Sequence, residues 1–108
     1  MNSCARACVC RLFRFFPALH GGETVSSGDH LNAPLGLTVA PNGDIVTVNG
    51  GDGNLVETTP EGAQFPPFLL DNSGSPPGAG ALFGIALVPN GQGLYFVDDA
   101  TNTLNLFH

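Results

Sequence analysis

The sequence predicts an all-β fold, and three observations support this prediction. Turn-forming residues are frequent, with 15 Gly and 9 Pro in 108 residues. Short apolar runs alternate with these turns, and long amphipathic helical patterns are scarce. A phrase built around Pro-Asn-Gly occurs twice, as VAPNGDIVTV and LVPNGQGLYFV, which indicates two copies of one structural unit. This length is typical of one domain.

The repeat extends well beyond this phrase. The spacing between matched residues is 48 positions before Gln92-Gly93 and 49 positions after it. The matched pairs are Gly36 and Gly84, Pro41 and Pro89, Asn42 and Asn90, Gly43 and Gly91, Ile45 and Leu94, Val48 and Val97, Asn49 and Asp98, and Leu55 and Leu104. Repeats of about 40 to 50 residues are typical of β-propeller blades.

Each copy begins with an expected strand that has one bulky and one small face. In LGLTVA, residues 35–40, Leu and Val alternate with Gly, Thr and Ala, and residues 83–88 repeat the pattern. A small face lets a neighbouring sheet approach closely. We therefore expect these two segments to be the innermost strands of two blades.

The remaining strands follow from the turns. Asn-Gly tolerates the positive φ angles of tight hairpins, so each Pro-Asn-Gly predicts a hairpin. Pro66 and Pro67 lack an N–H donor and belong on an unpaired edge. The further strands are expected at 44–49 and 93–99, at 54–59 and 103–108, and at 63–70 in the first copy alone. These elements predict one blade over residues 32–71 and an incomplete second blade over residues 80–108.

APLGLTVAPNGDIVTVNGGDGNLVETTPEG and LFGIALVPNGQGLYFVDDATNTLNLF resemble NHL repeats, and the resemblance covers residues 32–108. It implies a partial β-propeller of two antiparallel four-stranded blades, the second one incomplete. The first copy has Asn49 where the family has Asp, and the second has Asp98. The Arg common before the third-strand Ile is replaced by Asn54 and Thr103, which argues against the peptide and RNA binding of basic family members.

Two blades do not close a ring, because propellers contain four to eight blades. Three explanations stay open. The chain is a fragment of a longer propeller, it needs self-association to complete a ring, or it forms a small sandwich instead.

Charge excludes some classes of partner. The net charge is −6, with nine acidic residues, and the three basic residues are Arg6, Arg11 and Arg14. The rest of the chain would repel a phosphate backbone, so we do not expect nucleic-acid binding.

No apolar run approaches eighteen residues, so no membrane span is expected.

The first 22 residues form a leader that differs from the body, residues 23–108. The leader is basic and contains Cys4, Cys8 and Cys10, but no His lies at zinc-site spacing, so a metal site is not predicted there. Arg11 and Arg14 interrupt its apolar run. An export signal, a transit-like leader and an ill-defined start are all open. The first would favour an extracellular or periplasmic location, and the compartment is otherwise open.

Polar residues at the predicted strand ends are the candidate binding residues. They are Asp29, His30, Asp52, Asp71, Asn72, Asp98 and Asp99. Carboxylate-rich loops without Lys or Arg suit calcium, for which Asp52, Asp98 and Asp99 are the candidates. A second interpretation is that these side chains cap strand ends by binding nearby backbone amides, which needs no metal. No other cofactor is indicated.

Two hypotheses for function follow. The first is a non-catalytic propeller scaffold, or a fragment of one, that binds a protein, peptide or glycan through its rim loops. The alternative is a fragment of a calcium-dependent lactonase or related hydrolase, which the fold resemblance also allows. No residue is assigned as catalytic, because no Ser, His and Asp arrangement has the spacing of a nucleophile and its base. We therefore favour the scaffold over an enzyme.

Overall fold

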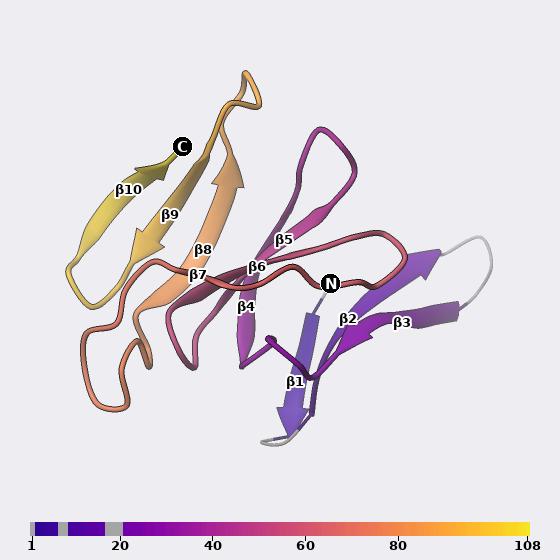
Figure 1. Ribbon diagram of the computed structural model, residues 1–108, viewed down its shortest axis with the longest axis horizontal. Helices are drawn as coiled ribbons and strands as arrows, with labels where there is room; N and C mark the ends of the chain where they lie inside the picture. Colours follow the sequence, from indigo (N-terminus) through magenta and orange to yellow (C-terminus); the bar gives the residue numbers. More distant parts are fainter. Residues whose placement is uncertain (1, 7–8, 17–20) are drawn as a thin grey trace.

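The computed structural model describes residues 2–6, 9–16 and 21–108, which form ten strands and no helix (Figure 1). The predicted all-β class is confirmed. In this described part of the chain there is accordingly no helix of the length and apolarity needed to cross a membrane.

The strands form three antiparallel sheets that follow one another along the chain. Sheet A contains β1 (Asn2–Arg6), β2 (Val9–Phe16) and β3 (Gly21–Ser27); sheet B contains β4 (Pro34–Val39), β5 (Ile45–Asn49), β6 (Asn54–Thr58) and β7 (Phe68–Leu69); sheet C contains β8 (Leu82–Leu87), β9 (Leu94–Asp98) and β10 (Thr103–Phe107). The described residues of the leader thus lie in sheet A, whose last strand continues into the body. The two predicted repeats form sheets B and C, with four and three strands.

Sheets B and C share one pairing register. Val48 lies opposite Leu55 between β5 and β6, and Val97 lies opposite Leu104 between β9 and β10. Every pair between β5 and β6 has a counterpart 49 positions later between β9 and β10. The first strand of each sheet also has its register irregularity at the same place. The sequence repeat is therefore a repeat of strand pairing.

The Pro-Asn-Gly turns are equivalent as well. The Asn42 side chain accepts the backbone N–H of Asp44, and the Asn90 side chain accepts that of Gln92, at 2.9 Å in both turns. Such a side-chain bond to the amide two residues on is the usual reason for Asn in a turn. Both turns lie at the upper side of Figure 1.

The fourth strand of sheet B is shorter than the predicted segment, residues 63–70. Gln64 forms an isolated bridge with Thr58, and only Phe68–Leu69 pair with β6 as β7. The two prolines between these contacts have no N–H for the ladder, so pairing is interrupted there.

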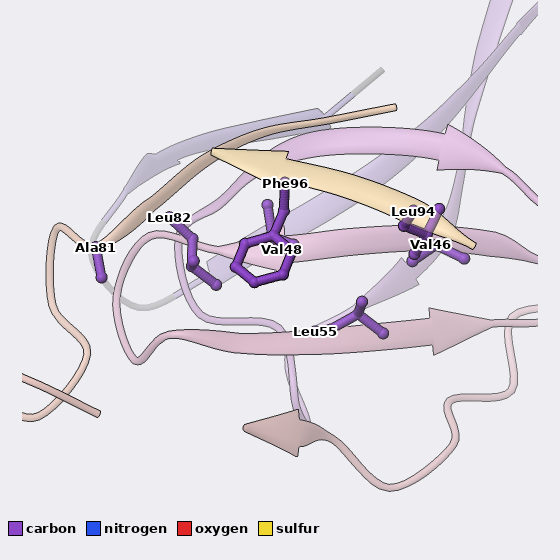
Figure 2. Packing of buried hydrophobic residues seen from close by; sticks show 7 residues of the cluster. All are labelled: Val46, Val48, Leu55, Ala81, Leu82, Leu94 and Phe96. Atoms are coloured by element: carbon purple, nitrogen blue, oxygen red, sulfur yellow. The ribbon is translucent and has the colours of Figure 1, made fainter. Parts of the chain in front are cut away.

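Sheet C packs against one face of sheet B and forms the main hydrophobic core. Sheet B contributes Val48 and Leu55, and sheet C contributes Leu82, Leu94 and Phe96, all of them buried (Figure 2). Burying side chains of this size stabilises a fold by roughly 1.5–3 kcal/mol each. The packing of sheet C on sheet B therefore fixes the position of the two repeats relative to each other.

The closest approach of the two sheets is at Gly36 in β4. A Cβ placed on Gly36 would overlap the carbonyl oxygen of Phe83 and would lie 3.2 Å from the backbone nitrogen of Ile85, both in β8. The small face of β4 therefore lets the β8 backbone approach, as its sequence predicts.

The opposite face of sheet B is covered by the segment that precedes it. Leu31 packs on the fully buried Val56, with Val25, Leu37 and Ile45 around them. Strand β1 of sheet A lies beside β4. Sheet B is thus covered on both faces, which explains the almost continuous apolar sequence of β5.

Candidate functional site

Most of the predicted binding residues lie on three loops at one end of sheets B and C, toward the lower left of Figure 1. The loops are residues 50–53, 71–80 and 98–102, and together they are called the acidic rim here. The backbone N–H of Gly80 donates to the carbonyl of Gly50 at 2.7 Å, and that of Asp99 donates to the carbonyl of Ala81 at 2.6 Å. These bonds join the loops into one surface, which carries Asp52, Asp71, Asn72, Asp98 and Asp99.

Two glycines allow the first two loops to come together. Gly53 and Gly78 have φ angles of 74° and 78°. A Cβ on Gly53 would overlap the carbonyl oxygen of Asp71, and one on Gly78 would overlap that of Asp52. Only glycine combines this conformation with this lack of space. The backbones of Asp52 and Asp71 are thereby held close to each other.

Asp71 and Asp98 form a carboxyl pair between the linker and the end of β9. Burial of Asp98, which is 6% exposed, raises its pKa, and a hydrogen bond and the charge of Asp71 raise it further. The hydrogen bond with Asp98 lowers the pKa of Asp71, and bonds from Ser73 act in the same direction. Asp98 therefore keeps its proton to a higher pH than Asp71 does.

Both carboxyls also cap the backbone that follows them. Asp98 accepts the N–H groups of Ala100 and Thr101 at 3.0 and 3.2 Å, and Asp71 accepts that of Ser73 at 2.6 Å. These are the strand-end hydrogen bonds of the second interpretation drawn from the sequence.

Asn49, the repeat counterpart of Asp98, is a buried polar side chain with several hydrogen-bond partners. It was not among the predicted binding residues. Its amide nitrogen donates to Asp52 at 3.0 Å and to the carbonyl of His30 at 2.8 Å. Its amide oxygen accepts the backbone N–H of Asn32 at 3.1 Å. Asn49 is fully buried, so its polar atoms need hydrogen-bond partners within the protein. These bonds connect the loop before β4 to the loop after β5. The period of 49 residues was the signal that pointed to this position.

Asp29 and His30 lie on the loop before β4 and are not joined to the acidic rim by their side chains in any described hydrogen bond. Asp29 is exposed, with a φ angle of 56°. His30 is half-buried, and its backbone N–H donates to the side chain of Gln64 at 2.9 Å. The rim residues Asn72 and Asp99 are exposed.

Two of the three calcium candidates, Asp52 and Asp98, are engaged in hydrogen bonds within the protein. Asp52 already accepts hydrogen bonds from the backbone of Asn54 at 3.1 Å and from the Asn49 side chain. In the part of the chain that the structure describes, no three His, Cys, Asp or Glu side chains converge on one point as metal ligands.

A second acidic pair lies at the opposite end of sheet B, near the Pro-Asn-Gly turn. A hydrogen bond with Asp44 raises the pKa of Glu57, and burial and the negative charge of Asp44 add to the effect. Asp44 is itself buried and is held by the Asn42 side chain. The sequence offered no local signal for this pair, because Asp44 directly precedes β5 and Glu57 lies on β6.

An apolar cleft lies at the same end, between the two Pro-Asn-Gly turns. It has a volume of about 230 Å³. Its lining residues include Pro41 and Val46 from sheet B and Leu87, Leu94 and Phe107 from sheet C. This cleft and the acidic rim occupy opposite ends of the sheets, and neither carboxyl pair is among the residues that line the cleft.

Comparison with known proteins adds no assignment: no protein-family model matches the chain, and no curated protein sequence matches it.

Proposed function

We propose that the chain is a non-catalytic scaffold of the NHL-repeat propeller type, or a part of one, that binds a partner through the acidic rim. Its partner is a protein, peptide or glycan, and the charge of the rim favours a basic protein or peptide. The repeated register of sheets B and C and their face-to-face packing support the propeller part of the proposal.

The observation that carries the binding part is the joining of loops from successive repeats into one acidic surface. Backbone hydrogen bonds link the loop after β5, the linker after β7 and the loop after β9. No Lys or Arg follows Arg14 in the sequence, so no basic side chain of residues 15–108 neutralises this surface. Clustered charge of one sign attracts oppositely charged partners and accelerates their association.

Nuclear magnetic resonance tests this proposal with a lysine-rich peptide as the probe. We expect amide shifts to change in residues 50–53, 71–80 and 98–102, and the change to weaken as salt is added. Asp99→Asn should weaken binding several-fold, because it removes an exposed charge from the rim. Glu61→Gln removes an exposed charge from the opposite end of sheet B and is the matched control. Equal effects of the two substitutions, or shifts centred on the Pro-Asn-Gly turns, would refute rim binding.

The alternative function, a fragment of a calcium-dependent lactonase or hydrolase, draws on the pairing of Asp71 with Asp98 at the rim. A bound calcium ion would stabilise the native state, by about 2.7 kcal/mol at a concentration of 100 times its Kd. The scaffold proposal predicts no change in melting temperature with calcium compared with magnesium at the same concentration. A rise with calcium that a chelator reverses would favour the enzyme instead.

A further inference from the structure

The chain contains three Asn-Gly dipeptides, at residues 42–43, 49–50 and 90–91, and the structure holds them in three different ways. The backbone nitrogen that follows an Asn can attack the side-chain amide carbon, and Gly permits this attack because it has no side chain in the way. Asn is accordingly one of the residues that make a protein chemically labile. The surroundings of each dipeptide therefore decide which one reacts.

The fold protects the dipeptide at residues 49–50. Asn49 is fully buried, and both the nitrogen and the oxygen of its side-chain amide are hydrogen-bonded. The backbone N–H of Gly50 donates to the carbonyl of Ala33 at 2.8 Å. Because the attacking nitrogen and the amide are both held, this dipeptide should be the slowest of the three to react.

The other two dipeptides belong to the Pro-Asn-Gly turns, whose backbones are equivalent. Asn42 and Asn90 are both exposed, and each side-chain oxygen accepts the backbone N–H two residues on at 2.9 Å. The glycine that follows each Asn donates its N–H to the carbonyl three residues earlier, at 2.9 Å in the first turn and 2.7 Å in the second. The glycine nitrogens are thus similarly engaged, so a difference in reactivity has to come from their surroundings.

The turns differ at the position two residues after the Asn. In the first turn this residue is Asp44, whose carboxyl accepts a second hydrogen bond, from the amide nitrogen of Asn42, at 3.3 Å. In the second turn it is Gln92, and among the hydrogen bonds of the described residues the amide nitrogen of Asn90 has no acceptor. The Asn42 amide is therefore held at both of its polar atoms, and the Asn90 amide at one.

Two further differences act in the same direction. Asp44 is negatively charged, and a nearby negative charge disfavours loss of the proton from the Gly43 nitrogen. The second turn is also one residue longer, because Val88 donates to the carbonyl of Gly93 where Ala40 donates to that of Asp44. A longer closed turn has a higher entropic cost, so it opens more readily.

We propose that Asn90 is a site of selective spontaneous deamidation, because its turn lacks the carboxyl that holds Asn42. The Gly91 nitrogen loses its proton and bonds to Cγ of Asn90, the bond from Cγ to the side-chain nitrogen breaks, and this nitrogen leaves with the proton as ammonia. Water then opens the cyclic succinimide at either carbonyl and gives Asp or isoaspartate. The reaction consumes water and leaves a negative charge beside the apolar cleft, which Gly91 lines. It does not depend on partner binding at the acidic rim.

The test follows the three Asn residues in the full chain, incubated folded at mildly alkaline pH. Peptide mass spectrometry measures the deamidated fraction at each site, after cleavage with chymotrypsin because no Lys or Arg follows Arg14. We expect Asn90 to react several-fold faster than Asn42, and Asn49 to react slowest. The same chain in urea is the control: its dipeptides have lost these hydrogen bonds, so their rates should converge.

Gln92→Asp gives the second turn the carboxyl that the first turn has, and it should slow the reaction of Asn90 several-fold. Gln92 is exposed, so the fold should be unaffected, which circular dichroism checks. Asn72→Asp is the matched control, because it adds the same charge at an exposed position on the acidic rim, at the other end of the sheets. This variant should leave the rate at Asn90 unchanged. If Gln92→Asp fails to fold, the comparison of the two turns in the unmodified chain still decides the question.

Equal rates at Asn42 and Asn90 in the folded chain would overturn the proposal. So would an unchanged rate at Asn90 in Gln92→Asp, or an equal slowing in Asn72→Asp. The same ratio of rates in urea as in the folded protein would also overturn it, because the selectivity would then not come from the structure.

Discussion

Val48 and Val97 occupy the same position in two successive repeats, but Val48 is fully buried and Val97 is 44% exposed. Each lies opposite a leucine on the next strand, Leu55 and Leu104, in the same register. The difference therefore does not come from the residue or from its own sheet. It arises because sheet C covers Val48 and nothing in the described structure covers Val97.

The first prediction concerns the glycines on these two faces. Gly36→Ala should destabilise the protein by about 1–3 kcal/mol, because the added methyl group meets backbone atoms of β8 that cannot rotate away. Gly84→Ala should be neutral or stabilising by up to about 1 kcal/mol, since it has room and reduces the entropy of the unfolded chain. Urea denaturation at low protein concentration measures both. Equal losses of stability would contradict the packing described here.

The second prediction concerns Asp98 and pH. Burial and Asp71 raise the pKa of Asp98 in the folded protein, so folding is favoured when this carboxyl is protonated. Its contribution therefore becomes unfavourable as pH rises from the ordinary Asp value through the raised one. Asp98→Asn keeps an acceptor for the amides of Ala100 and Thr101 and adds an N–H donor toward Asp71. We expect this variant to be more stable than the wild type at neutral pH and to lose less stability as pH rises.

Asp99→Asn is the control, because it removes one charge from the exposed neighbour of Asp98. Free energies of unfolding for the three proteins, measured at several pH values between about 4 and 7, give the comparison. The explanation fails if Asp98→Asn has the same pH profile as the wild type, or if Asp99→Asn flattens the profile equally.

The third prediction concerns a buried hydroxyl group. Thr58 is fully buried, and its Oγ1 has no hydrogen-bond partner among the described residues. Thr58→Val removes this unsatisfied group and should stabilise the protein by about 1 kcal/mol. Thr47→Val is the matched control: Thr47 is equally buried, but its hydroxyl donates to the carbonyl of Val56 at 3.4 Å. The control should gain nothing or lose stability, so a higher melting temperature for Thr47→Val than for Thr58→Val would refute the argument.

Local patterns predicted the repeated elements well and the contacts between them poorly. The alternation around Gly36 and the Pro-Asn-Gly turns predicted the strands and hairpins, because these depend on neighbours in sequence. The two prolines were expected on an edge, but the length of β7 depended on where an N–H was still available for pairing. The pairing of Asp71 with Asp98 joins residues far apart in sequence, so their hydrogen bond and pKa changes had no local signal.

The sequence by itself determined the all-β class, the turns and the 48- to 49-residue period, since each follows from the conformational preferences and alternation of adjacent residues. Only the tertiary structure decided which faces are buried and which carboxyls interact with each other. Repeated sequences have the same local preferences, but burial depends on what lies next to each sheet. Val48 and Val97 show this directly. Sheet C covers Val48, whereas no sheet of the described structure covers Val97, which is exposed to solvent.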